Sequence, residues 1–251
     1  MRVMSFNLLC GGEGENTVRK RRGIATEKIL ELKPDLLGVQ EATPEWMRWL
    51  KAKLSDYAFV GVGRDDGKKK GEYSAVFYLK DKFDLLDSGT FWLSETPDKV
   101  SQGWDGVCKR ICSWALLQEK SSGKKLAHMN THLDHKGFLA RKNGIGLILE
   151  KARELDDYSL VVTGDFNLFE GSEEYEWLMA GTLKDSKFLS PQTEDKGTFH
   201  GFGEDGDMKV IIDYVLVNDK FKPQTYRIVS EGVNGRAVSD HHPVCVDMDY
   251  N

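Results

Sequence analysis

Several apolar runs of this chain end in side chains that can bind a metal ion or move a proton. Together these side chains are Asn7, Glu41, His132, Asp134, Asp165, Asn167, Asp213, Asp240 and His241. Carboxylate and amide oxygens suit a hard divalent cation, and a carboxylate or a neutral imidazole can accept a proton. Residues at strand ends are held rigidly and still reach a cleft. The pattern therefore indicates a polar site built where several strands end.

The segment Gly164-Asp165-Phe166-Asn167 has the most informative spacing. Because side chains alternate in an extended chain, Asp165 and Asn167 point to the same side, which suits two groups that converge on one reacting atom. Any single member of the set also has an ordinary structural explanation. An Asn or Glu at a strand end is commonly a turn or helix cap, and a lone His is commonly a satisfied core residue. The functional interpretation therefore depends on the ordered set.

The ordered motifs resemble those of the metal-dependent endonuclease/exonuclease/phosphatase superfamily, whose fold is that of DNase I. The resemblance runs from Ser5 to Val244 and rests on Ser-Phe-Asn-Leu-Leu at 5–9, Gly-Val-Gln-Glu at 38–41, Asn-Thr-His-Leu-Asp-His at 130–135, Thr-Gly-Asp-Phe-Asn at 163–167, Ile-Ile-Asp-Tyr-Val at 211–215 and Ser-Asp-His-His-Pro at 239–243. One such motif is weak evidence, but the set in this order is specific. Segments 91–97, 103–105 and 110–114 further resemble a bacterial branch whose members mostly lack an assigned substrate.

The resemblance implies a role for each matched residue. The implied metal ligands are Asn7, Glu41 and Asp240, and the implied metal is Mg²⁺, with Mn²⁺ as a substitute. The implied catalytic residues are His132, Asp165, Asn167, Asp213 and His241. In this scheme Asp165 orients and deprotonates the attacking water, while His132, Asn167 and His241 contact phosphate. Asp213 accepts the second N–H of His241 and so fixes its tautomer.

Candidates for contact with the substrate are Arg110, Asp134, His200, Trp92 and Trp104. A guanidinium suits bidentate phosphate contact, although a surface ion pair explains Arg110 equally well. Large aromatic residues such as these line pockets, but they are at least as often packed in the core. His135 and His242 each adjoin a motif histidine, and neighbours in an extended chain point to opposite faces, so we expect both outside the site. Arg141 is expected on a solvated helix face.

The elements that must carry these residues alternate between strand and helix. The patterns predict strands at 3–10, 36–39, 57–62, 73–79, 83–87, 113–118, 125–132, 160–162, 211–217, 226–229 and 244–248, and helices at 18–32, 44–54, 137–155 and 172–179. Strands this apolar need cover on both faces, whereas amphipathic helices need it on one. We therefore expect an α/β/β/α sandwich of two packed mixed sheets flanked by helices, in a single domain over residues 1–251. Residues 65–71 and 194–207 are expected as exposed loops.

The composition excludes several classes of protein. With 40% apolar and 30% charged residues, the chain is too apolar for disorder and too interrupted by charge for a membrane span. A formal net charge of −5 lacks the basic balance typical of proteins that bind long nucleic acids. The four cysteines form no C-x-x-C pair, which favours buried thiols in a reducing compartment. Residues 1–6 lack the features of a signal peptide, so we expect a cytoplasmic location, although a chain whose leader had been removed looks the same.

These observations together predict a function. We expect a divalent-metal-dependent phosphoester hydrolase in which an activated water attacks a small phosphomonoester or phosphodiester, such as a phosphorylated sugar, lipid headgroup or nucleotide. Cleavage of DNA or RNA is the alternative, because an acidic protein can carry a local positive groove. A non-catalytic protein that binds a phosphorylated ligand is a second alternative. It predicts a missing metal ligand or base, and none is missing here. The sequence does not indicate an oligomeric state.

Overall fold

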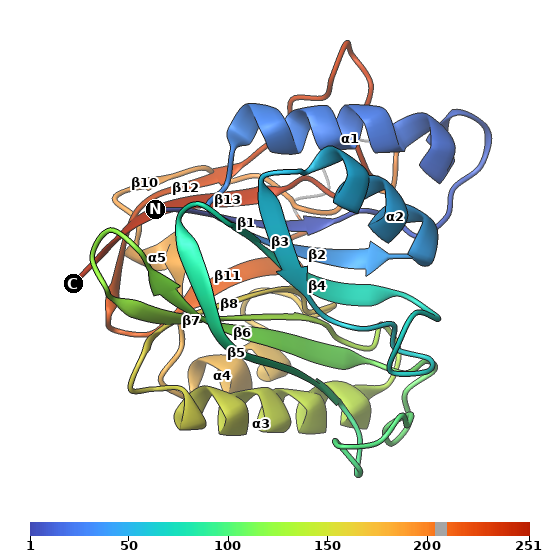
Figure 1. The fold of residues 1–251 in the computed structure, drawn as a ribbon. Helices are drawn as coiled ribbons and strands as arrows, with labels where there is room; N and C mark the ends of the chain where they lie inside the picture. Colours follow the sequence, from blue (N-terminus) through green and yellow to red (C-terminus); the bar gives the residue numbers. More distant parts are fainter. Residues whose placement is uncertain (204–209) are drawn as a thin grey trace.

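The apolar runs form the strands of two β-sheets that pack face to face (Figure 1). The structure is a computed structural model that describes residues 1–203 and 210–251. Helices cover the outer face of each sheet, so the molecule has four layers in the order α/β/β/α. The fold class predicted from the sequence is therefore confirmed.

One sheet has seven strands and contains the N-terminal strand. Their order is β10-β12-β13-β1-β2-β4-β3. The bounds are β1 Arg2–Asn7, β2 Leu36–Ala42, β3 Tyr57–Val60, β4 Tyr73–Leu79, β10 Gln192–Thr193, β12 Phe221–Ile228 and β13 Val244–Tyr250. β1 and β2 are parallel, whereas β13 pairs with β1 in the antiparallel sense. Asn7 pairs with Gln40 in the parallel register, so Asn7 and Glu41 come together at one edge of the sheet.

The other sheet has six strands in the order β5-β6-β7-β8-β11-β9. The bounds are β5 Phe83–Trp92, β6 Ile111–Glu119, β7 Lys125–His132, β8 Ser159–Asp165, β9 Lys184–Asp185 and β11 Asp213–Val217. β7 and β8 are parallel and end together, so that His132 is the register partner of Asp165. β11 runs antiparallel to β8 and begins where β8 ends, with Asp213 opposite Asp165. These polar residues therefore lie side by side across neighbouring strands.

The helices bury one face each against the sheets. Helices α1 (Val18–Leu32) and α2 (Pro44–Lys53) pack on the seven-stranded sheet, and α3 (Phe138–Glu154) and α4 (Glu173–Met179) cover the six-stranded sheet (Figure 1). A short helix α5 (Ser186–Leu189) and a 3₁₀ turn η1 (Gly14–Asn16) complete the described helices. Thr43 caps α2, since its side chain accepts the Trp46 N–H at 3.4 Å. Within residues 1–203 and 210–251, no helix is long and apolar enough to cross a membrane.

The observed elements differ from the predicted ones where hydrogen bonds between strands, and not the spacing of apolar residues, determine the bounds of a strand. β5 continues beyond its predicted end at 87, although its leucines Leu85 and Leu86 are exposed. It is an edge strand with a register shift after Leu85, so hydrogen bonds to β6 define it. β12 begins before its predicted start at 226, and β9, β10 and α5 are too short to leave a periodic signal. Of the predicted loop 194–207, residues 204–207 lie outside the described residues.

A buried polar network joins the two sheets behind their polar edges. Gly38 of β2 lies so close to the opposite sheet that a Cβ at this position would be 2.0 Å from Thr163 Oγ1. Gln40 Nε2 and Thr163 Oγ1 both donate to Asn130 Oδ1, at 2.7 and 2.9 Å. Asn130 Nδ2 in turn donates to the Val39 carbonyl at 2.9 Å. Hydrogen bonds therefore fix how one sheet sits on the other at this end of the molecule.

Candidate active site

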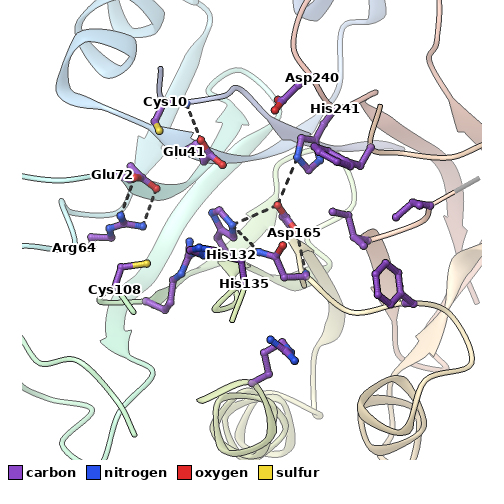
Figure 2. Close-up of a pocket in the computed structure, with 17 residues that line it drawn as sticks. Cys10, Glu41, Arg64, Glu72, Cys108, His132, His135, Asp165, Asp240 and His241 are labelled. Atoms are coloured by element: carbon purple, nitrogen blue, oxygen red, sulfur yellow. Dashed lines mark hydrogen bonds and ion pairs between the residues drawn. The ribbon is translucent and has the colours of Figure 1, made fainter. Parts of the chain in front are cut away.

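The polar strand ends of both sheets open into one cleft of about 710 Å³. The predicted site residues that line it are Glu41, Arg110, His132, Asp165, Asn167, Asp240 and His241. Asn7 and Asp213 lie beneath this lining, each hydrogen-bonded to one of its members. The structure thus gathers the predicted metal and catalytic candidates in one place, with contributions from both sheets (Figure 2).

The imidazole of His241 is held by a buried carboxylate. Its Nδ1 lies 2.8 Å from Asp213 Oδ2, and both side chains are almost fully buried. Burial opposes the charged form of this imidazole, but the paired carboxylate of Asp213 and the nearby carboxylate of Asp165 raise the pKa of His241 to about 10. His241 is therefore a cation at neutral pH, with Nε2–H available on the side away from Asp213.

Asp165 is a buried carboxylate at the centre of the cleft. Its Oδ2 accepts a hydrogen bond from Asn7 Nδ2 at 2.9 Å, and its Oδ1 accepts the Asn167 N–H at 3.0 Å. Burial raises the pKa of the Asp165 carboxyl, the charge of Asp213 raises it further, and the charge of His241 offsets part of this shift. A carboxylate that holds a proton more firmly than usual is suited to act as a general base.

His132 remains neutral beside this base. Its Nε2 lies 3.0 Å from Asn167 Nδ2 and 3.4 Å from Asp165 Oδ2. Burial lowers the pKa of His132 well below the ordinary value, and the positive charges of Arg110 and Arg64 lower it further. The Asn167 amide donates to Nε2 in the tautomer of the neutral ring that carries its proton on Nδ1.

Two further carboxylates, those of Glu41 and Asp240, line the cleft and are the candidate metal ligands. Glu41 lies at an irregular position of β2 with φ of 56°, a backbone conformation that turns its side chain out of the strand pattern. Its Oε2 accepts the Cys10 N–H at 2.7 Å. Burial raises the pKa of Asp240, His241 opposes this shift, and the like charge of Glu41 adds to it. Two mutually repelling carboxylates in one cleft offer the oxygen ligands that a hard divalent cation prefers.

Asn7 supports this pair from below. Its Nδ2 donates to Glu41 Oε1 at 3.2 Å as well as to Asp165, while its Oδ1 accepts the Leu9 N–H at 3.0 Å. This arrangement makes Asn7 a positioning residue that links the candidate metal ligand to the candidate base. Its implied role as a direct metal ligand stays a prediction.

The comparison with known proteins bears directly on this arrangement. The model of the endonuclease/exonuclease/phosphatase family matches residues 4–241. This chain belongs to that family. Hydrolysis of phosphoesters and dependence on a divalent metal are general to the family.

Relatives within the family differ in what their names say they act on. A family member from Bacteroides vulgatus is 36% identical, with a TM-score of 0.95 over 100% of this chain and 98% of that chain. A mannosyl-6-phosphatase from Bacteroides thetaiotaomicron is 34% identical, with a TM-score of 0.93 over 99% of each chain. The Ccr4 3'-5'-exoribonuclease subunit of Debaryomyces hansenii is 24% identical over 85% of this chain. The chain spans only 31% of that subunit's length.

Of the residues predicted to contact the substrate, Arg110 lines the cleft and the others do not. Arg110 is buried and lines the cleft, with Nη2 at 3.1 Å from His135 Nδ1. Among the described residues, the other candidates do not belong to the lining of the cleft: Asp134, His200, Trp92 and Trp104. Asp134 instead accepts backbone N–H groups, including those of Gly137 at 2.8 Å and Val107 at 2.9 Å. The geometry thus gives Asp134 a structural role in its loop.

Two of the remaining candidates lie behind residues of the cleft lining and are hydrogen-bonded to them. The buried Trp92 donates its indole N–H to the Arg64 carbonyl at 2.8 Å, which places it behind a residue of the cleft lining. His200 lies behind Asp240, whose carbonyl accepts the His200 backbone N–H at 3.0 Å. The Trp104 N–H is directed at Glu95. Direct substrate contact by these residues is not supported by this arrangement.

Several residues that line the cleft were not singled out by their sequence context. They are Cys10, Arg64, Glu72, Cys108, Phe169, Phe199, Val210 and Ile212, together with His135 and Arg141, which we expected outside the site. The alternation argument fails for His135 because β7 ends at His132 and the chain turns there. The spacing of Asp165 and Asn167 does not extend to Phe169, because β8 ends at Asp165 and Asn167 has φ of 48°.

Thr198 holds the histidine and its carboxylate partner in register. It is fully buried, and its Oγ1 accepts the backbone N–H groups of Ile212 at 3.1 Å and Asp213 at 3.2 Å. Its carbonyl accepts the His242 N–H at 2.7 Å. One residue therefore fastens the backbone on both sides of the Asp213–His241 contact.

Proposed function

We propose that this protein is a Mg²⁺-dependent hydrolase of small phosphomonoesters, with Mn²⁺ as a substitute and small phosphodiesters as a further substrate class. The observation that carries this proposal is the pairing of the cationic side chains in the cleft. The lining arginines each face a carboxylate of the protein: Arg64 with Glu72 at 2.7 Å, Arg141 with Glu174 at 3.1 Å and Arg110 with Asp134 at 3.9 Å. Binding of long nucleic acids relies on many cations that neutralise successive phosphates. Paired arginines supply little of that attraction, so a compact substrate is favoured.

The reaction begins with the carboxylate of Asp165. Its raised pKa suits it to accept the proton of a water molecule that attacks phosphorus. The bond between phosphorus and the ester oxygen breaks in the same displacement, and the released alkoxide takes up a proton from solvent and leaves as the alcohol. The hydrogen bonds from Asn7 and Asn167 hold this carboxylate in one orientation, so the water is activated in a fixed place.

The phosphoryl group is held by donors of the cleft. His241 carries its positive charge at neutral pH and donates Nε2–H to a phosphoryl oxygen, while Asp213 fixes the ring. Asn167 and His132 lie next to the base and offer amide and imidazole groups to the water or the phosphate. Glu41 and Asp240 would hold the divalent cation, which would supply positive charge to offset the negative charge of the phosphate and of the leaving oxygen.

A hydrolysis screen tests the proposal. Purified protein with Mg²⁺ or Mn²⁺ is assayed on phosphomonoesters, phosphodiesters and single- and double-stranded oligonucleotides across a salt series. We expect the highest kcat/KM on a small monoester, with little change between low and physiological salt, and no activity in EDTA. Faster cleavage of an oligonucleotide, with a steep fall as salt rises, would overturn the small-substrate proposal in favour of a nuclease. Binding of the phosphoesters without any turnover would instead favour a non-catalytic protein.

A further inference from the structure

The cleft extends beyond the reacting groups into a polar region. Figure 2 shows Arg64, Glu72 and Cys108 on one side of His132, with His241 on the other side. Arg110 and His135 also line the cleft and contact each other. A cleft of about 710 Å³ has room for a phosphate and an organic group of the size of a hexose.

The ion pair between Arg64 and Glu72 is rigidly placed. Two parallel contacts join the side chains, at 2.7 and 2.8 Å, and their exposed fractions are only 15% and 18%. The Arg64 N–H also donates to the Glu72 carbonyl at 3.0 Å, and the Arg64 carbonyl accepts the indole N–H of Trp92. Such a pair presents fixed donors and acceptors and loses little entropy when a ligand binds.

Donors in this region lack partners within the described residues. Arg64 Nε, Arg110 Nε and Arg110 Nη1 are buried, and none of them donates a hydrogen bond to an acceptor of the described residues. The Arg110 side chain is 7% exposed and still lines the cleft. Buried N–H groups are nearly always satisfied, so oxygen atoms of water or of a ligand are required here.

The charges of the region balance. Arg64 and Arg110 are positive, while Glu72 and Asp134 are negative, and burial with the nearby Arg110 charge lowers the pKa of His135, which is therefore neutral. Because the region has no net positive charge, it favours a neutral polar group over a second anionic group. A hydroxyl group matches it, because it donates to a carboxylate and accepts from a guanidinium at once.

We propose that Arg64, Glu72 and Arg110 form a subsite that binds hydroxyl groups of the substrate, so that the preferred substrates are phosphate monoesters of polyols. This inference rests on the proposed function, and it adds that the organic group is recognised by residues separate from those that hold the phosphate. Sugars and cyclitols share the required chemistry.

The test compares substrates with and without hydroxyl groups. Mannose 6-phosphate and myo-inositol 1-phosphate represent the two sources of polyol, and phenyl phosphate carries no hydroxyl group. The variants are Glu72→Gln, which keeps the shape of the side chain, and Arg64→Met. We expect kcat/KM to fall about 10- to 100-fold more for the better polyol phosphate than for phenyl phosphate, mainly through KM. The better of the two polyol phosphates identifies the source.

A matched control is available on the surface. Arg2 forms a similar double contact with Asp247, at 2.8 and 2.9 Å, and does not line the cleft. Arg2→Met should leave the ratio of the two kcat/KM values unchanged. Equal losses on polyol and phenyl phosphates in Glu72→Gln would overturn the subsite while leaving the proposed function in place.

A binding measurement separates the two proposals. Calorimetry in EDTA needs no turnover, and we expect mannose 6-phosphate or myo-inositol 1-phosphate to bind the wild type more tightly than phenyl phosphate does. Glu72→Gln should remove that difference. Tighter binding of phenyl phosphate by the wild type would overturn the subsite directly. Absence of hydrolysis with selective polyol binding intact would count against the hydrolase proposal alone.

Discussion

Replacement of Asp213 by Asn is the sharpest test of the arrangement around His241. The substitution keeps the size of the side chain and removes the negative charge that lies 2.8 Å from His241 Nδ1. Without that charge, burial of the imidazole is opposed only by more distant carboxylates, so the pKa of His241 falls from about 10 toward or below the ordinary value.

The size of the effect follows from the change in charge. At pH 8 nearly every molecule with the wild-type pKa carries a protonated His241, whereas a pKa of about 6.5 leaves only about one molecule in thirty protonated. If the charged imidazole holds the phosphoryl group, kcat/KM at pH 8 falls about 30-fold from this cause alone. At pH 6 most molecules are protonated in both proteins, so the loss is much smaller there.

The assay is a profile of kcat/KM against pH for wild type and Asp213→Asn at constant Mg²⁺. We expect the alkaline limb of the profile to move to lower pH in the variant. Asp219→Asn, an exposed aspartate just after the same strand, is the matched control and should leave the profile in place. An unshifted alkaline limb in Asp213→Asn would refute the assignment of a charged His241 held by Asp213.

Three further substitutions test the metal site, the base and the positioning residue. Glu41→Gln should weaken Mg²⁺ binding in calorimetry by at least about tenfold while circular dichroism stays unchanged, because a neutral amide replaces a carboxylate ligand; unchanged metal affinity would exclude the ligand role. Asp165→Asn should lower turnover by about 10² to 10⁴-fold. The raised pKa of Asp165 means that the ionised carboxylate destabilises the folded protein at high pH. The same variant should therefore melt about 2–4 °C higher than wild type at pH 8 in EDTA. The difference should close at acid pH, where the wild-type carboxyl is protonated. Thr198→Val leaves two buried N–H groups without an acceptor, so it should lower kcat and move the alkaline limb of the pH profile of kcat/KM. Thr198→Ser keeps the hydroxyl and should have the kcat and the alkaline limb of the wild type.

The sequence predicted the position of the candidate residues in the fold where they lie at a strand end. His132, Asp165 and Asp213 each lie at the end of an apolar run, and the topology of the six-stranded sheet places those ends side by side. The period of the apolar residues and the order of strands and helices are local properties, so the sequence carries them directly.

The polar region of the cleft could not be predicted in the same way. Arg64 and Glu72 lie in a charge-rich connection between β3 and β4, where an isolated arginine or glutamate is ordinarily a solvated residue. Their proposed role depends on their contact with each other and with the neighbouring Trp92, which come together only in the tertiary structure. Thr198 is a similar case, since its hydroxyl accepts a hydrogen bond from the backbone of Asp213, which follows later in the chain.

The hydrogen bonds between the sheets have a consequence for how activity is lost. Glu41 belongs to the seven-stranded sheet and Asp240 to the loop that leads into its strand β13, whereas Asp165 and His132 belong to the six-stranded sheet, so neither half of the molecule holds a complete site. Apolar faces tolerate sliding, but the directional bonds of Asn130 with Gln40 and Val39 do not. A small displacement of one sheet over the other therefore raises the free energy of the protein. Mild denaturant that loosens the packing should abolish turnover before secondary structure melts, which makes catalysis a sensitive reporter of alignment between the sheets.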